Sequence, residues 1–452
     1  MAETHGGGGA RPGRGPYHPR TLARRRVNAK LRTRDATAMA VGGMIGGGIF
    51  SVLGVAITLA GNLAFGCFVL GGILAAITAR SYAGVTLRAG SSGGAFDDLR
   101  IRGHPGLAGG LLWLLVGGYM IAMAVYSFTF GRYAANALDA PTWAARLLSV
   151  AVVALFLAIN LRGVHLSSIT EDLIVLTKLV VLFGVAAIGM FAFTPDRLSP
   201  LLDSGAGGLL LGTATVFFAY EGFELISYDL GDMDRPERTF PRALMLSVGI
   251  VAAVYISVTI GAQMLVSDQA IVTQKEVAFI AVGEAALGGV GRWLAILGAV
   301  LATGSAINAT LFSAARLVRD ASASGEVPGL LGRESRGLPV VALIVVSAVG
   351  TALAMLPGIT VVIVFGSGAF LAVYTLVNSL QAAMAERRRD RVLAATGAIA
   401  CAAAICALVI ELARDDLPSL FILLGTTAVV VLARVAFVHG RRTHAIRAED
   451  TA

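Results

Sequence analysis

The chain has 452 residues, a length that would indicate two or three domains in a soluble protein. Its composition excludes that class, because 56% of the residues are hydrophobic and only 14% are charged, whereas an average soluble domain carries about a quarter charged residues. The apolar residues form runs of about 20, the length that a helix needs to cross a bilayer. The sequence therefore predicts an all-α polytopic membrane protein. Its three cysteines all lie in apolar runs, which excludes a secreted disulfide scaffold.

About twelve membrane spans are expected, with a polar segment at each end of the chain. Residues 1–35 are rich in Gly, Pro and Arg and predict a disordered basic tail, and residues 439–452 form a second polar tail. The expected spans cover residues 36–60, 63–85, 106–134, 147–165, 166–193, 207–230, 241–266, 290–318, 338–356, 359–385, 392–412 and 418–438. An even number of spans places both termini on the same side of the membrane.

The positions of the charges predict the topology. The formal net charge is +8, and twenty-nine Lys and Arg residues fall on the side of the termini, against six on the opposite side. Because cytoplasmic loops retain the excess of positive charge, both termini are predicted to be cytoplasmic, in a multi-pass protein of the cytoplasmic membrane. The basic balance thus indicates topology and contact with anionic membrane lipid, and not nucleic-acid binding.

Motifs of soluble enzymes do not occur in the sequence. Its six histidines pair with no cysteine or carboxylate at metal-ligand spacing. The glycine-rich stretch 42–48 resembles a dinucleotide fingerprint, but no βαβ unit surrounds it. We therefore expect no metal site, no tightly bound cofactor and no enzyme activity.

The first span contains five glycines within residues 42–48. Each glycine costs a helix about 1 kcal/mol relative to alanine. One interpretation is close helix packing through small residues. The other is a broken helix, because freed backbone groups in a bilayer are tolerated where protein or a water-filled cavity satisfies them. Such groups can bind a polar solute.

The sixth span contains a second interruption, in which Glu221, Gly222 and Glu224 occur close together. Carboxylates in the middle of a span are costly and usually face an interior pathway. The first and sixth spans are equivalent members of two five-span halves, residues 36–193 and 207–385, and residues 392–438 lie outside both. Paired breaks at equivalent positions indicate a transporter built from inverted repeats.

Four short motifs occur in an order that is typical of one transporter family. They are GIF at residues 48–50, SSGGAF at 91–96, NLRGV at 160–164 and RPERTFPRA at 235–243. With them, the chain from about residue 36 to residue 378 resembles the amino acid–polyamine–organocation transporters. Gly231 and Arg235 depart from the family pattern, in which a glutamate and an asparagine are usual, so the resemblance says less about the cytoplasmic gate.

The resemblance implies a core of ten helices in two inverted repeats, as in sodium-coupled amino acid symporters, with two peripheral helices. It also implies a substrate site at the two breaks, formed by Met44, Gly46, Gly47, Gly48, Phe218, Tyr220, Glu221 and Gly222. Amides of the three first-span glycines would bind a substrate carboxylate, since a half-helix N-terminus presents free N–H groups and a positive dipole end. Carbonyls at the two breaks would bind the ammonium. Phe218 matches an aromatic gate, although plain packing also explains it.

Lys178 is one of only three lysines in the chain and lies in the fifth span. It stands about 12 residues from the start, roughly 18 Å along a helix, where a charge costs about 3 kcal/mol or more. Snorkelling or an ion pair is one interpretation. The resemblance implies another, because proton-coupled relatives carry a lysine here: its ammonium would take the place of a sodium ion, near Gly42, Thr303 and Ser305. Lysine, unlike arginine, can lose its proton when desolvated. Hydroxyl groups in a span otherwise bond their own helix.

The sequence thus predicts a secondary active transporter that takes up amino acids with protons by alternating access. A sodium-independent exchanger of amino acids or polyamines is the alternative. The expected partners are an amino acid substrate, protons and membrane lipid.

Overall fold

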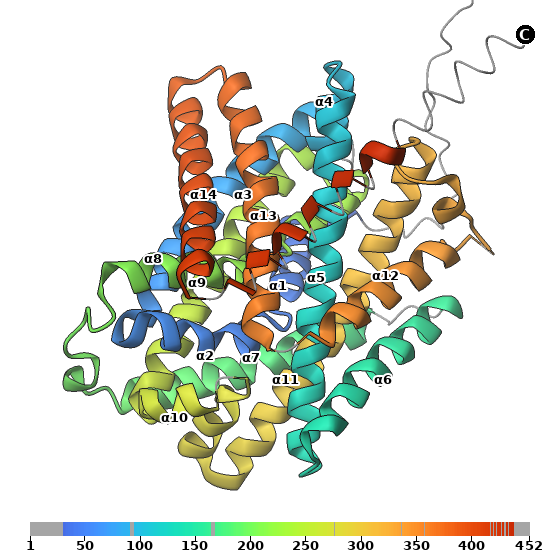
Figure 1. The fold of residues 1–452 in the computed structure, drawn as a ribbon. Coiled ribbons are helices and arrows are strands. Elements are labelled where there is room, and N and C mark those ends of the chain that lie inside the picture. The colour runs from blue at the N-terminus through green and yellow to red at the C-terminus, as the bar shows by residue number, and fades with distance from the viewer. Residues whose placement is uncertain are drawn as a thin grey trace, which may run out of the picture. The chain divides into compact units, whose positions relative to one another are not determined.

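The computed structural model describes residues 30–90, 95–163, 168–274, 276–335, 337–356 and 358–415, and part of 417–437. Within these residues the chain is helical or forms loops, with two isolated β-bridges (Figure 1). The α-helices are α1 (Thr33–Met44), α2 (Gly48–Ala60), α3 (Ala64–Ala89), α4 (Ala95–Ile101), α5 (Pro105–Ala137), α6 (Thr142–Leu161), α7 (Ser168–Phe191), α8 (Gly205–Val216), α9 (Pro236–Leu265), α10 (Asp268–Thr273), α11 (Ala278–Ala323), α12 (Val340–Ala354), α13 (Ile359–Met384) and α14 (Arg388–Asp415). Five 3-10 segments join them: η1 (Gly61–Leu63), η2 (Pro195–Leu198), η3 (Phe217–Tyr220), η4 (Phe223–Asp232) and η5 (Gly329–Gly332).

The prediction of an all-α polytopic membrane protein is confirmed. In the described part of the chain, nine helical segments are long and apolar enough to cross a membrane, and α12 is a shorter apolar helix. One of the nine segments, Gly48–Ala89, joins α2 to α3. The expected span 418–438 lies partly outside the described residues, and its described positions are helical. The tail residues 1–29 and 438–452 and motif residues 91–94 and 164 lie outside the described part.

Several helix boundaries differ from the sequence-based expectation by a few residues; α6 and α9, for example, each begin five residues early. Helix α1 begins at Thr33, three residues before the expected start. Just before it, Leu31 pairs with Met233 in the loop after η4. Helix α11 extends well before residue 290, but it contains non-helical backbone at Leu287 and Gly288. Gly288 has a φ of +61°. The expected start of this span comes from hydropathy, which carries no information on backbone conformation.

The two broken spans pack against each other and against a frame of unbroken helices. Helix α1 contacts η4 and α9, and α2 contacts α8 and η3. Helix α5 packs against α6, α11, α12 and α13, while α13 and α14 form an adjacent pair (Figure 1). The packing places the breaks of the first and sixth spans next to each other.

Large apolar side chains are exposed on the outer helices. Leu155 on α6, Phe183 on α7 and Ile399 on α14 are all exposed. In water such faces would be unfavourable, but hydrocarbon accommodates them. The exposed apolar faces are therefore the lipid-facing surface.

Candidate functional site

The first span is broken between Met44 and Gly48. Helix α1 ends at Met44 and α2 begins at Gly48, with Gly47 as its N-cap and no side-chain cap. No backbone carbonyl of the described residues accepts a hydrogen bond from the amides of Gly46, Gly47 or Gly48. These amides stand at the positive end of the α2 dipole, an arrangement that favours an anionic group. The broken-helix interpretation is confirmed.

Close packing also operates at the same glycines. A Cβ atom on Gly46 would lie 2.6 Å from Cβ of Ala306, and one on Gly48 would lie 3.0 Å from Cα of Ala219. These distances are shorter than ordinary van der Waals contact. The glycines are therefore consistent with both the broken helix and the close packing. They leave backbone amides free, and they allow the backbone of neighbouring segments to approach closely.

The sixth span is broken at Glu221 and Gly222. After α8 the chain continues as η3, then Glu221 is extended and Gly222 has a φ of +104° before η4 begins. A Cβ on Gly222 would lie 3.1 Å from the carbonyl of Gly43, and one on Gly43 would lie 3.3 Å from the carbonyl oxygen of Gly222. The two breaks thus meet backbone against backbone.

Tyr255 on α9 holds the two breaks together. Its hydroxyl oxygen lies 2.9 Å from the carbonyl oxygen of Met44 and 3.0 Å from that of Ala219. The single hydroxyl proton is therefore shared between one carbonyl from each break. Sequence reasoning missed this residue, because a buried tyrosine is known to need a partner but its sequence position does not say which one.

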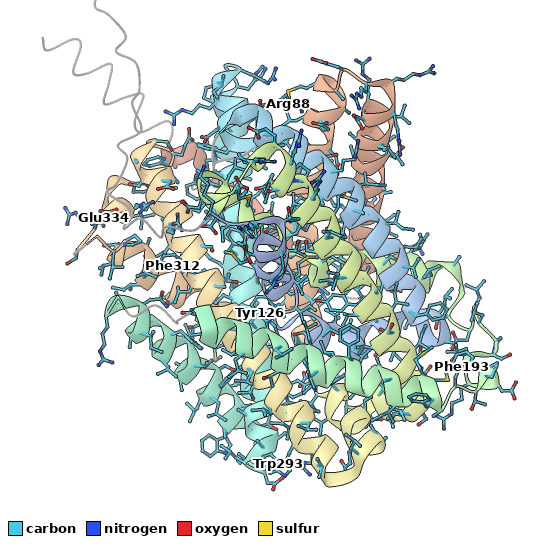
Figure 2. The ribbon with its side chains drawn as sticks, turned by 180° about the vertical axis from the view of Figure 1, so that it is seen from behind. Arg88, Tyr126, Phe193, Trp293, Phe312 and Glu334 are labelled. Atoms are coloured by element: carbon cyan, nitrogen blue, oxygen red, sulfur yellow. The ribbon has the colours of Figure 1, made fainter. Side chains whose placement is uncertain are left out.

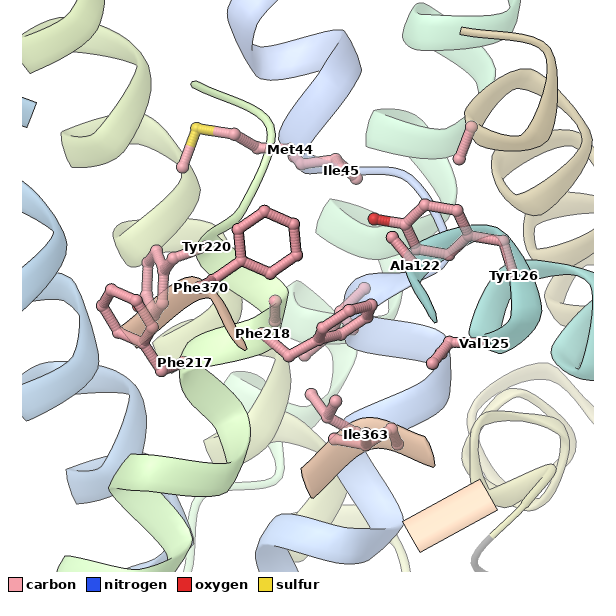
Figure 3. Packing of buried hydrophobic residues seen from close by; sticks show 14 of the residues in the cluster. Met44, Ile45, Ala122, Val125, Tyr126, Phe217, Phe218, Tyr220, Ile363 and Phe370 are labelled. Carbon is pink, nitrogen blue, oxygen red and sulfur yellow. The ribbon is translucent and has the colours of Figure 1, made fainter. Parts of the chain in front are cut away.

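Tyr126 on α5 and Thr303 on α11 surround Gly47. A Cβ on Gly47 would lie 2.6 Å from Cδ1 of Tyr126 and 3.0 Å from the Thr303 methyl. The Tyr126 ring centroid is 5.9 Å from that of Phe218, and Figure 3 shows Phe218 beside α2 with the Tyr126 hydroxyl directed towards the Ile45 segment. The predicted residues Gly47 and Phe218 are thus brought together. The Thr303 hydroxyl donates to the carbonyl of Ala299 on its own helix, at 2.6 Å.

Tyr220 belongs to the second break by its backbone only. Its hydroxyl donates to the carbonyl of Phe68 on α3 at 2.6 Å, and its ring packs 5.5 Å from that of Tyr255. Figure 3 places the Tyr220 side chain beside Phe217, away from Tyr126. The Tyr220 side chain thus joins η3 to α3. A role of Tyr220 in substrate binding stays a prediction, and it would involve the backbone of this residue.

The two carboxyl groups of the second break have different surroundings. Glu224 accepts hydrogen bonds from the hydroxyl of Tyr374 at 2.9 Å, the amide of Gly222 at 3.0 Å and the hydroxyl of Tyr119 at 3.3 Å. Glu221 is only 4% exposed, and its Oε2 has no hydrogen-bond partner among the described residues. In the described part of the chain no Lys or Arg lies within ion-pair distance of Glu221.

Lys178 contacts the end of the first half-helix. Its side chain is 0% exposed, and Nζ donates to the carbonyl of Gly42 at 2.8 Å. Gly42 stands in the last turn of α1, where carbonyls have no partner within the helix. The helix break therefore creates the acceptor that the lysine uses, and the predicted proximity of Lys178 and Gly42 is present.

A cavity of about 380 Å³ lies beside these residues. Gly42, Gly43 and Ser305 line it, as does Phe312, which is labelled in Figure 2. Its polar lining includes Asn308, whose side-chain oxygen accepts a hydrogen bond from Asn160 at 2.9 Å. The cavity therefore brings a polar, open space to the carbonyl that Lys178 contacts.

Ion pairs join the helix ends on the other side of the breaks. Arg132, near the end of α5, lies 2.5 Å from Glu276, just before α11. Arg292 on α11 lies 3.1 Å from Asp139 in the loop after α5. On this side of the breaks the ion pairs join α5 to the region of α11. On the opposite side, the cavity lies between α1 and α11.

Two spans broken in the middle, packed break to break beside a one-sided cavity, define a polytopic membrane transporter. Comparison with known proteins gives the family. The chain belongs to the amino acid permease family, whose sequence model matches residues 31–433, in agreement with the resemblance to amino acid–polyamine–organocation transporters.

Individual relatives are also transporters. An inner membrane transport protein of Escherichia coli is 29% identical, over 68% of this chain and 72% of its own length. The methylthioribose transporter of Bacillus subtilis is 27% identical, over 67% and 69%. The human Asc-type amino acid transporter 1 is 29% identical, over 76% and 66%.

Proposed function

We propose that this chain is a secondary active transporter that takes up amino acids together with protons across the cytoplasmic membrane. One observation carries the proposal. The fully buried Lys178 donates to the Gly42 carbonyl at 2.8 Å and so joins α7 to the broken end of α1. A titratable cation at a helix break is suited to couple protonation to movement of that helix.

The substrate class follows from the first break. Free amides at Gly46, Gly47 and Gly48 offer donors to a carboxylate, and backbone carbonyls at the two breaks offer acceptors to an ammonium. An amino acid carries both groups on one carbon atom. The description of the family as amino acid permeases supports this class, as does the printed name of the human relative.

Proton coupling would act through the charge on Lys178. In its charged form the ammonium binds the α1 carbonyl end, which carries the negative end of a helix dipole. Loss of the proton removes that attraction and frees α1 to move relative to α7. The cavity reaches Gly42, the residue whose carbonyl Lys178 contacts, and on this proposal the proton leaves to water on that side. Because a fixed cation occupies the place of a sodium ion, no sodium is required.

Alternating access would use the asymmetry of the two sides. With cytoplasmic termini, the cavity faces the cytoplasm, and the ion pairs Arg132–Glu276 and Arg292–Asp139 close the outer side. Cysteine labelling tests the orientation: positions near residues 140 and 200 should react from outside, and positions near 235 and 325 from inside. The opposite result at two of these loops contradicts the orientation.

Uptake into proteoliposomes tests the coupling. Wild-type protein should concentrate amino acid under an imposed pH gradient with no sodium present. Lys178→Ala should abolish that accumulation, and Lys178→Arg should abolish it too, because arginine keeps its charge. Thr177→Ala is the matched control on the same helix, since the Thr177 hydroxyl donates to the carbonyl of Leu173 one turn earlier.

Two results would contradict proton coupling. One is wild-type uptake that requires sodium and ignores pH. The other is a Lys178→Ala variant that still concentrates substrate on a pH gradient. Substrate-for-substrate exchange with no net accumulation in the wild type would favour the exchanger instead.

A further inference from the structure

Glu221 differs from Glu224, the other buried carboxyl group of the second break. Its Oε2 is buried without a hydrogen-bond partner, whereas Glu224, three residues away, accepts three hydrogen bonds. A buried polar atom without a partner costs free energy, so its presence needs a reason. Glu221 also lies directly before Gly222, at the point where the two breaks meet.

Among the residues that the structure describes, no Lys or Arg lies within ion-pair distance of Glu221. Tyr126 from α5 and Tyr374 from α13 interact with it electrostatically, as does the Glu224 carboxyl from η4. From α9, Tyr255 interacts with Tyr126 and uses its hydroxyl proton on the two backbone carbonyls. The α1 and α2 residues at the break are glycines, Met44 and Ile45, which do not titrate.

Charge accounting then restricts what can bind beside Glu221. A zwitterionic amino acid is neutral, and its carboxylate and ammonium are matched by the amides and carbonyls of the breaks. With such a substrate, an ionised Glu221 would have no opposite charge within ion-pair distance among the described residues, and a buried carboxylate without a paired cation is strongly unfavourable in a medium of low dielectric constant. Either a proton on Glu221 or a second cation on the substrate removes that charge.

We propose that Glu221 is the specificity-determining residue of this transporter and binds either one proton or the cationic side chain of the substrate. The inference rests on the proposed function, because it requires an amino acid in the site. A neutral amino acid binds together with a proton that moves from water to the Glu221 carboxylate. A cationic amino acid binds to the ionised carboxylate without that proton. The site thus accepts both classes and carries the same charge with each.

Matched pairs of ligands test the proposal on the purified full-length protein. Lysine and norleucine differ by the terminal ammonium, and arginine and citrulline are nearly isosteric but differ in charge. Binding by titration calorimetry in two buffers of different ionisation enthalpy gives both the affinity and the protons taken up. Wild-type protein should take up one more proton with norleucine than with lysine. Its affinity for norleucine should fall by up to tenfold per pH unit relative to lysine as the pH rises.

The Glu221→Gln variant separates the two ligands further. A glutamine has the shape of the protonated acid but cannot ionise. The variant should bind norleucine and citrulline as the wild type does at low pH, without the extra proton uptake. It should bind lysine and arginine about tenfold to a hundredfold more weakly than the wild type. Glu284→Gln, at an exposed position on α11, is the control and should leave all four affinities unchanged.

The possible failures are distinct. If Glu221→Gln binds lysine as tightly as the wild type, or if norleucine and lysine bind with equal proton uptake, the inference is wrong while amino acid transport stands. If the folded variant loses all four ligands, Glu221 binds the α-ammonium and the charge-exchange scheme is wrong. If no amino acid binds the wild type at any pH, the proposed function fails, and the inference fails with it.

Discussion

Gly222→Ala should separate the two helix breaks. Gly222 has a φ of +104°, and a left-handed conformation costs an L-residue with a side chain about 1–2 kcal/mol. The new Cβ would also lie 3.1 Å from the Gly43 carbonyl, which is backbone and cannot rotate away; such overpacking costs about 1–3 kcal/mol. The lower entropy of the unfolded alanine variant offsets about 0.4–1 kcal/mol. The net destabilisation should be about 1–5 kcal/mol.

A glycine of the same chain provides the control for this change. Gly249 lies within α9, and a Cβ there would meet nothing within 4 Å. Gly249→Ala should therefore stabilise the protein by about 0.5–1 kcal/mol. The assay is the unfolding temperature of each purified variant in detergent, with and without a bound amino acid. Gly222→Ala should unfold at a lower temperature than the wild type and gain less from ligand. If it unfolds at the temperature of Gly249→Ala and binds as the wild type does, the two breaks do not depend on their backbone contact.

Three further changes have defined outcomes. Gly47→Val should abolish amino acid binding in a folded protein, because its side chain fills the space before the α2 amides; Gly117→Val, at an open helical position, should retain binding in the same titration. Tyr255→Phe should destabilise by about 1–3 kcal/mol, seen as a lower unfolding temperature, and an unchanged temperature would contradict the bridging role. Partial burial raises the pKa of Asp268, so the folded state binds its proton more tightly and this group favours folding less as pH rises; Asp268→Asn should therefore stabilise the protein more at pH 8 than at pH 4 in parallel thermal scans.

The sequence predicted the parts of the site that break a local rule. Clustered glycines in an apolar span and a lysine at mid-span are unfavourable in a regular membrane helix, so both stand out without a structure. The break at residues 45–47 was predictable for that reason. Lys178 stood out for the same reason, but its contact with Gly42 was expected only from the family resemblance.

The parts that obey local rules were not predictable. Tyr126 and Tyr255 are ordinary apolar-span residues by sequence, and their positions become informative only when α5 and α9 pack against the breaks. The same applies to the difference between Glu221 and Glu224. Both are carboxylates in the same segment, and only tertiary contacts with Tyr119 and Tyr374 satisfy one and leave the other without a partner at Oε2.

The scarcity of lysine makes Lys178 a built-in chemical reporter. The whole chain contains only two others, Lys30 and Lys275, and Lys178 is the one enclosed at the helix break. An amine-reactive reagent modifies a lysine only when its amine is accessible and uncharged. The rate at which the peptide that contains Lys178 is modified, read by mass spectrometry, therefore measures opening and deprotonation of this position together. That measurement needs no mutation and no introduced label, so the native transporter can be followed through its cycle in membranes.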